Sequence, residues 1–375
     1  EREIRNFSSK PNFKTQAVFQ TESKKIIQAQ LLKLFSSKQE ATMFLEQNTS
    51  AKFKVGEVKK KPAKKSPAPP FTTSTLQQEA SRKLYFSVSK TMNMAQRLYE
   101  SGHITYMRTD SVNLSEEARK NINVQIGLDY GDKYLQPRHF KSKNKGAQEA
   151  HEAIRPTDFS KQKLNIDYDQ ARLYELIWRR TVASQMSDSI LERTQISIQA
   201  DTHNNPFNAK GEVITFDGFL KLYMEGVDDQ VDEDNSLLPK VSQGDVIYLN
   251  RMLATERFSR PPFRFSEASL VKKMEELGIG RPSTYAPTIS TIQNRNYIEK
   301  GSSEGISRYY DQIILEGKEI KSKNLNEMVG ADKGKLIPTD IGLIVNDFLV
   351  ENFKNILDFN FTAQVEQNFD DIANG

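Results

Sequence analysis

The order of strand-like and helical segments is the feature that most constrains this fold. Residues 12–20 and 52–58 alternate apolar and polar side chains, as half-buried strands do. The same alternation returns in residues 194–200, 212–216 and 245–249, after a long stretch with helical spacing. We therefore expect a multidomain α+β protein in which a helical domain is inserted into a β-rich module.

The length of 375 residues also favours several domains, because one hydrophobic core seldom extends over so long a chain. We expect residues 1–65 and 193–256 to form the two parts of a β-rich arch. Residues 66–192 should form the inserted helical domain, and residues 257–375 part of a mostly helical domain. The lysine- and proline-rich run at residues 59–70 is interpreted as an extended connector, or alternatively as a tether for DNA.

Periodicity and capping residues predict individual helices. Residues 24–35 and 168–191 place apolar side chains at helical spacing, so we expect a helix in each. Thr72, Thr73 or Ser74 is expected to cap a further helix, because short hydroxyl side chains accept hydrogen bonds from free N–H groups.

Two glycine-containing motifs invite a phosphate-binding interpretation. Ser283 or Thr284 should cap the helix that follows residues 278–280, and the N-terminal end of a helix suits a phosphate. Residues 330–336 resemble a phosphate loop, but only three residues separate its glycines instead of four, and leucine follows the lysine. We interpret this second motif as a loop and predict no ATP site.

Composition limits the classes of function. The chain has 53 Lys and Arg against 49 Asp and Glu, a net charge of +4, which is weak support for a polyanionic partner. It contains no cysteine, which excludes disulfides, thiol catalysis and zinc ribbons within these residues. No apolar run approaches the roughly 20 residues that a membrane span needs. We expect no membrane partner and a cytoplasmic location.

The stretch around Tyr106 has the composition of a nucleophilic site. In an extended segment Tyr106, Arg108 and Asp110 project to the same side, because side chains alternate along a strand. A guanidinium neutralises phosphate oxygens and favours the phenolate form of a tyrosine. Asp110 would hold that guanidinium or cap the helix that begins near Leu114. On spacing alone, a surface tyrosine beside an arginine is the stronger interpretation, because such neighbours are common on protein surfaces.

His151 and Arg155 stand four residues apart and would share one face of a helix. A lone histidine is more often a structural hydrogen-bond partner than a ligand contact. The zinc motif H-E-x-x-H fails here, because Arg155 occupies the position of the second histidine. We expect no metal ligands in this stretch.

The literal sequence around these residues resembles the bacterial type IA DNA topoisomerases. The strings that carry the resemblance lie at residues 70–78, 91–99, 101–111, 148–157, 280–286, 292–298, 336–342 and 358–364. The resemblance implies a toroidal core with a β-rich arch, an inserted helical domain that carries the catalytic tyrosine, and a gate that opens.

The same resemblance implies roles for individual residues. Tyr106 would form a 5′-phosphotyrosine link to one DNA strand, with Arg108 stabilising the transferring phosphoryl group and Asp110 orienting the site. His151 would contact substrate DNA and Arg155 a phosphate. The further DNA contacts would be Arg281, Ser283, Thr284 and Arg295.

The resemblance finally implies cofactors and partners. The family's Mg²⁺ binds a D-x-D-x-E cluster in an N-terminal Toprim domain, a pattern absent from this chain, so we expect a fragment that lacks Toprim and is inactive alone. Expected partners are single-stranded and negatively supercoiled DNA, bound by a monomer near the nucleoid and without ATP. A non-catalytic single-stranded DNA-binding module is the alternative. A tyrosine recombinase would need a larger Arg and His constellation.

Overall fold

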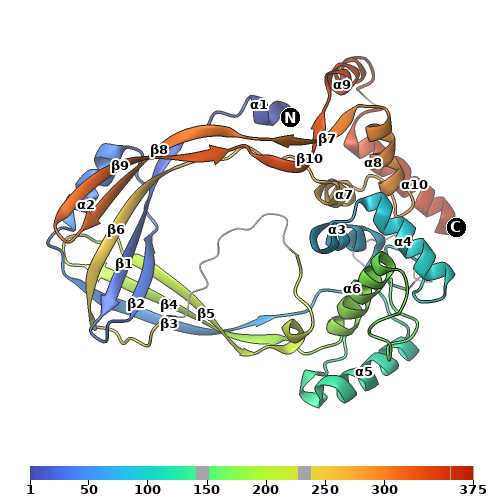
Figure 1. The fold of residues 1–375 in the computed structure, drawn as a ribbon, viewed down its shortest axis with the longest axis horizontal. Coiled ribbons are helices and arrows are strands. Elements are labelled where there is room, and N and C mark those ends of the chain that lie inside the picture. Colours follow the sequence, from blue (N-terminus) through green and yellow to red (C-terminus); the bar gives the residue numbers. More distant parts are fainter. Residues whose placement is uncertain (141–151, 227–237, 355, 375) are drawn as a thin grey trace.

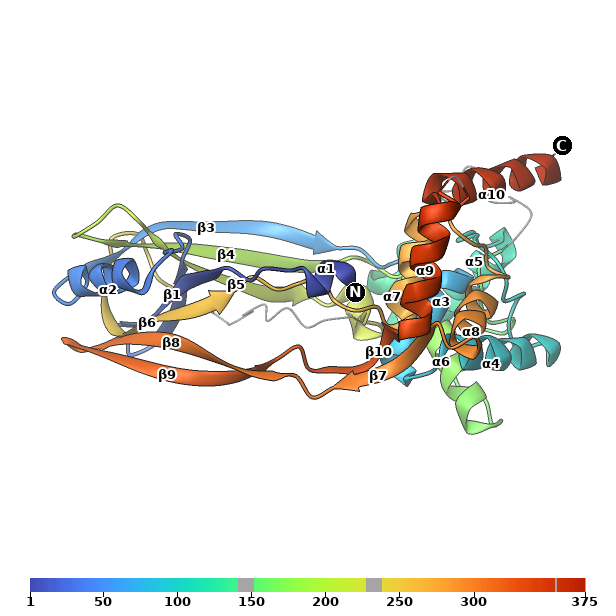
Figure 2. The same ribbon diagram turned by 90° about the horizontal axis from the view of Figure 1, so that it is seen from above.

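The computed structural model describes residues 1–140, 152–226, 238–354 and 356–374. Its elements are arranged as a ring, with strands on one side and most helices on the other (Figure 1). Viewed from above, the long strands run from the strand-rich side towards the helices (Figure 2). The mixed α+β class expected from the sequence is confirmed.

The strand-rich side is a closed antiparallel barrel with two extra strands. The eight-stranded sheet has the order β1-β2-β5-β4-β3-β6-β8-β9, and an additional pairing of β1 with β6 closes the first six strands into a ring. The bounds of these strands are β1 Pro11–Thr21, β2 Ile26–Leu31, β3 Phe53–Lys65, β4 Ser189–Ala200, β5 Phe207–Phe216, β6 Val246–Phe258, β8 Ile306–Glu316 and β9 Glu319–Val329.

Aromatic side chains fill the barrel. The Phe19 ring is fully buried and lies 5.0 Å from the Phe53 ring and 5.6 Å from the Phe207 ring, both at edge-to-face angles. The expected alternation of residues 12–20 is confirmed, because every second side chain of β1 points inward. β3 and β4 are neighbours in the sheet although residues 66–188, which contain the inserted helices, separate them in sequence.

The helix predicted for residues 24–35 was wrong. This stretch contains β2 (Ile26–Leu31), in which Ile27, Ala29 and Leu31 are buried while Ile26 is half exposed. The spacing of its apolar residues fits both the two-residue period of a strand and the period of a helix. Antiparallel pairing with β1 selects the strand. The helix of this region, α2, lies later, at Lys38–Gln47.

The connector predicted for residues 59–70 was also wrong over its first half, because β3 continues to Lys65 and pairs with β4 throughout. Only Phe53 and Lys54 of β3 pair with β6, so the later part of β3 is an edge strand. Pro62 is tolerated there, since its missing N–H can face the unpaired side. Carboxylates pair with three of the lysines: Lys59 lies 2.7 Å from Glu57, Lys60 3.0 Å from Glu192 and Lys65 2.7 Å from Glu212.

The inserted helices pack around one core that includes the fully buried Trp178. Trp178 Nε1 donates a hydrogen bond to Phe159 O at 2.9 Å. The helix predicted for residues 168–191 ends at Ser184, since β4 begins at Ser189. The helices are α3 Thr73–Leu84, α4 Val88–Glu100, α5 Glu116–Tyr130 and α6 Tyr168–Ser184.

Of the three candidate caps of α3, Thr72 is the one used. Thr72 Oγ1 accepts from Thr75 N at 3.2 Å, and Thr72 N donates to Thr75 Oγ1 at 2.9 Å, which completes a capping box. We expect Thr72→Ala to lower the free energy of unfolding by about 1 kcal/mol. Urea denaturation followed by circular dichroism measures it. Thr72→Ser keeps the hydroxyl and is the control; an equal loss in both variants would contradict the capping role.

Residues after 257 are less helical than expected. β6 crosses the predicted boundary at residues 256–257, and β8 and β9 extend the barrel sheet from β6. The loop predicted at residues 330–336 lies largely in β10, which pairs with β7. The elements of this part outside the large sheet are α7 Glu267–Glu276, α8 Tyr285–Asn294, β7 Ile298–Ser303, β10 Asp332–Pro338, α9 Asp340–Asn352 and α10 Phe359–Asn374. α10 lies at the end of the molecule away from the barrel (Figures 1 and 2).

Candidate active site

The segment from Tyr106 to Ser111 alternates as the sequence predicts. Tyr106 is 40% exposed, Arg108 is exposed and Asp110 is half-buried. The intervening side chains are buried in or against the helical core: Met107, Thr109 and Ser111. The three expected catalytic side chains therefore project from the same side of an extended, irregular segment.

The chain leaves α4 in a tight turn just before Tyr106. Gly102 adopts φ +74°, and its N–H donates to Tyr99 O at 2.8 Å. His103 N–H donates to Leu98 O at 2.9 Å. A positive φ costs glycine little, so Gly102 can turn the chain away from α4 at this point. Tyr106 thus lies four residues after Gly102, just beyond the end of α4 at Glu100.

Two threonines fix the backbone on either side of Tyr106. Thr105 N–H donates to Arg155 O at 2.9 Å. Thr73 Oγ1, at the start of α3, donates to Met107 O at 2.8 Å and accepts from Thr109 N at 2.9 Å. Because Thr73 is fully buried, the segment is held to α3 without exposing its backbone.

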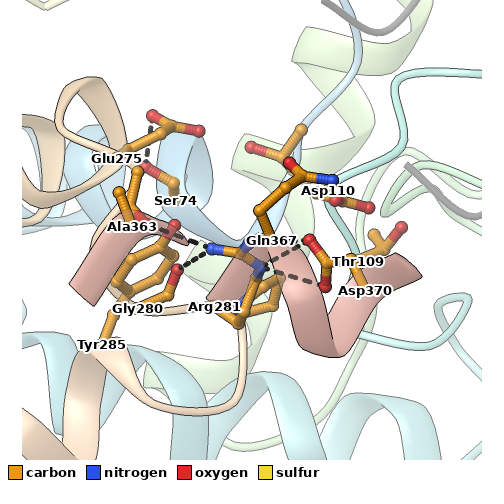
Figure 3. A pocket seen from close by; sticks show the side chains of 13 residues that line it. Ser74, Thr109, Asp110, Glu275, Gly280, Arg281, Tyr285, Ala363, Gln367 and Asp370 are labelled. Carbon is orange, nitrogen blue, oxygen red and sulfur yellow. Dashed lines mark hydrogen bonds and ion pairs between the residues drawn. The ribbon is translucent and has the colours of Figure 1, made fainter. Parts of the chain in front are cut away.

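Arg108 and Asp110 do not form the ion pair that was one of the two roles expected for Asp110. Within the described part of the chain, Arg108 makes no hydrogen bond or ion pair, so its guanidinium is available to an anion. Asp110 does not cap the following helix either, because Ser115 Oγ accepts from Ala118 N and caps α5. Asp110 instead lies on the wall of a cavity (Figure 3).

Arg155 is already engaged by a carboxylate. Its Nη2 lies 2.6 Å from Glu152 Oε2, and Glu152 Oε1 also accepts from Ser115 N at 2.5 Å. Burial alone raises the pKa of Glu152, but the bonds from Arg155 and Ser115 outweigh it and hold the pKa below its usual value. From Glu152 onward the segment is not helical, so the expected helical face is absent there. His151 lies outside the described residues.

A cavity of about 360 Å³ separates the tyrosine segment from the last part of the chain. Figure 3 shows Asp110 on one wall, with Glu275, Arg281 and Asp370 around the space. The residues that line it are Thr72, Ser74, Thr109, Asp110, Glu275, Gly278, Gly280, Arg281, Pro282, Tyr285, Ala363, Gln367 and Asp370. It thus joins α3, the tyrosine segment, α7, α8 and α10.

The predicted DNA contacts near α8 differ in their surroundings. Arg281 Nη2 lies 2.7 Å from Asp370 Oδ2 of α10, and Arg281 Nη1 donates to Gly280 O at 2.8 Å. Thr284 occupies the N-cap position of α8 but makes no side-chain cap; its Oγ1 accepts from Arg281 N. Ser283 and Arg295 are exposed. Only Arg281 of this group lines the cavity.

Glu275 is a carboxylate of this cavity whose pKa is raised. Ser74 Oγ donates to Glu275 Oε2 at 2.7 Å, across the contact of α3 with α7. Burial raises the pKa of Glu275, the bond from Ser74 lowers it, and the negative charges of Glu276 and Asp110 raise it further. The net direction is upward, so the fold favours the neutral form of Glu275 more than the unfolded chain does.

We expect Glu275→Gln to be more stable to unfolding than the wild type, by a margin that grows as pH rises. The folded pKa of Glu275 lies above its unfolded value, so the fold binds this proton more tightly, and stability falls as pH rises from the unfolded pKa through the folded one. Glutamine is neutral throughout. The urea midpoints of variant and wild type should agree near pH 4 and separate by pH 7. Glu117→Gln, exposed on α5, is the control; a separation independent of pH would contradict the shift.

The described residues hold neither a cluster suited to a metal ion nor a helix suited to spanning a membrane. Among the described residues, no group of three or more His, Cys, Asp or Glu is placed to hold a metal ion. None of the helices in the described ranges is both long and apolar enough to span a bilayer.

Several residues of this site escape sequence reasoning. Glu275 and Asp370 reach this cavity only through tertiary packing, and nothing in their local sequence marks them as site residues. Tyr99 is different, because it lies in residues 91–99, one of the stretches that resemble the topoisomerase family. The resemblance nevertheless assigned no catalytic or binding role to Tyr99. Its ring packs against the Tyr106 ring.

Comparisons with known proteins agree on one family. A family model described as DNA topoisomerase matches residues 1–308. DNA topoisomerase 1 of Rickettsia bellii is 42% identical over 367 residues, which cover 93% of this chain and 42% of that protein. DNA topoisomerase 1 of Rickettsia felis is 40% identical over 400 residues, and the match covers the whole of this chain and 47% of that protein.

A solved structure matches as well. Full-length topoisomerase I from Thermotoga maritima has a TM-score of 0.74 at 31% identity, over 99% of this chain and 56% of that one. The chain therefore spans about half the length of the proteins it matches.

Proposed function

Because the chain belongs to the bacterial-type (type IA) DNA topoisomerase family, we propose that Tyr106 is the nucleophile of a DNA strand-cleavage and resealing reaction. The observation that carries the proposal is the projection of Tyr106 and Arg108 from one side of a segment whose backbone is pinned to α3 and α4. A fixed backbone lets the protein present the phenol oxygen to a phosphodiester in a defined geometry.

The reaction exchanges one phosphoester for another. The phenol oxygen of Tyr106 forms a bond to phosphorus, the bond from phosphorus to the 3′ oxygen breaks, and the phenol proton ends on that 3′ oxygen. The strand 3′ of the cut then remains attached through its 5′ phosphate. The free 3′ hydroxyl reverses the step, so resealing needs no ATP. Passage of the other strand between the two steps would relax negative supercoils.

Arg108 is proposed to bind the phosphate that reacts, because its guanidinium is exposed and makes no ion pair within the described residues. Asp110 would orient the site from the cavity wall. Binding of the strand would fall to Arg281, Ser283, Thr284 and Arg295, with Arg155 on the side of the inserted helices. His151, which lies outside the described residues, would be a further DNA contact. Arg155 and Arg281 would each exchange a carboxylate for a phosphate on binding.

Mg²⁺ belongs to the family's chemistry, but the described residues do not fit a site for it. We propose that its ligands and full activity depend on residues outside this chain. We further propose that the protein acts on single-stranded and negatively supercoiled DNA, as a cytoplasmic monomer near the nucleoid.

The alternative, a non-catalytic module that binds single-stranded DNA, gains support from the exposed ring of Tyr106, since exposed aromatics stack on bases. End labelling separates the two functions. The full-length protein is mixed with Mg²⁺ and single-stranded DNA labelled at one end, then denatured rapidly. We expect the 3′ label, and not the 5′ label, to stay with the protein. Binding without any adduct would favour the alternative, and retention of the 5′ label would contradict the proposed polarity.

A further inference from the structure

The rings of Tyr99 and Tyr106 are in contact. Their centroids lie 5.2 Å apart at an interplanar angle of 69°, which is an edge-to-face arrangement. Both residues are 40% exposed, so neither ring is enclosed by the core. A contact of this geometry is the arrangement that aromatic quadrupoles prefer, and it restrains two rings that would otherwise rotate in solvent.

The backbone at both ends of this pair is already fixed. Tyr99 lies in the last turn of α4, whose Leu98 is fully buried, and its carbonyl oxygen accepts from Gly102 N. Met107, directly after Tyr106, is buried and held by Thr73. What remains free at Tyr106 is rotation of the side chain about χ1 and χ2.

We propose that Tyr99 is a positioning residue for Tyr106: its ring limits those rotations and keeps the phenol oxygen in the orientation required for attack. This inference rests on the proposed function. The Tyr106 ring is 40% exposed beside this contact, which leaves part of the ring and the hydroxyl to the DNA. The Tyr99 hydroxyl has no part in this role; the ring alone is required.

Single-turnover cleavage tests the inference. The full-length Tyr99→Ala, Tyr99→Phe and wild-type proteins are mixed with saturating single-stranded DNA, and the rate constant of adduct formation is measured after rapid denaturation. We expect Tyr99→Ala to lower this rate constant about 3- to 10-fold, the range set by aromatic pair energies. Tyr99→Phe should retain the wild-type rate constant. The dissociation constant for the DNA should change less than twofold in both.

Tyr168→Ala is the matched control, since it removes an exposed tyrosine from α6 of the same helical unit. Its rate constant of adduct formation should equal that of the wild type.

A wild-type rate constant in Tyr99→Ala would overturn the inference. So would a loss that appears in the dissociation constant, because Tyr99 would then be a base-stacking residue. A loss in Tyr99→Phe equal to that in Tyr99→Ala would also overturn it. If the wild-type protein forms no adduct, the proposed function fails; if it forms one and Tyr99→Ala matches it, only the positioning role fails.

Discussion

Tyr106→Phe is expected to abolish the covalent adduct and the relaxation of plasmid DNA while single-stranded DNA binding is retained. Phenylalanine keeps the ring, and with it the edge-to-face contact with Tyr99 and the path of the backbone over the buried Met107. It lacks only the oxygen that would bond to phosphorus. Adduct formation is measured by gel retention of labelled DNA, and binding by fluorescence anisotropy.

Tyr309→Phe supplies the control, because Tyr309 is exposed on β8 in the barrel sheet. Its adduct yield should equal that of the wild type. An adduct that persists in Tyr106→Phe would assign the nucleophile to another residue. Loss of binding together with the adduct would support a stacking role for the tyrosine instead of nucleophilic attack.

Arg108→Ala is expected to slow adduct formation by about 100- to 1,000-fold, the usual effect of removing one group that stabilises charge on the transition state. The guanidinium is exposed beside Tyr106, and within the described residues no carboxylate neutralises it. Arg108→Lys should recover part of the rate, because it restores the charge but not the two-pronged geometry. Quench-flow cleavage at saturating DNA measures the rate constant.

Arg193→Ala is the control for the loss of one positive charge, since Arg193 lies on β4 and pairs with Glu212 at 2.9 Å. Its cleavage rate should match that of the wild type. If Arg108→Ala changes only the affinity for DNA, with an unchanged rate constant at saturation, Arg108 binds the strand without stabilising the reacting phosphate.

The tyrosine segment was predictable because its determinants are local. Alternation from Tyr106 to Ser111 follows from the extended backbone, and Gly102 ends α4 through its own positive φ. The strands at residues 12–20 and 52–58 were predictable for the same reason. Residues 24–35 were not, because an apolar run that satisfies both periods is decided by its partners in the sheet.

The lysine run shows a second limit of sequence reasoning. A strand with several lysines and Pro62 looks unable to pack, but β3 is an edge strand whose neighbour β4 supplies Glu192. The compensating acid lies more than a hundred residues away in sequence. The four strands found within residues 298–338 were missed as well, because residues 257–375 were expected to form part of a mostly helical domain.

The cavity could not be predicted at all. Its walls bring Ser74 and Asp110 from the inserted helices against Glu275, Arg281 and Asp370 from the last part of the chain. Arg281 was expected to face a phosphate, yet here it binds a carboxylate, because Asp370 on α10 supplies the anion. The partner of Arg281 therefore depends on the packing of α10 against this part of the chain, which the local sequence does not determine.

Identification of the residue that carries DNA tests the central claim most directly. The full-length protein is trapped on single-stranded DNA, digested with nuclease and trypsin, and analysed by tandem mass spectrometry. The account predicts a nucleotide joined through its 5′ phosphate to Tyr106. A nucleotide on another residue, or one joined through its 3′ phosphate, would contradict it.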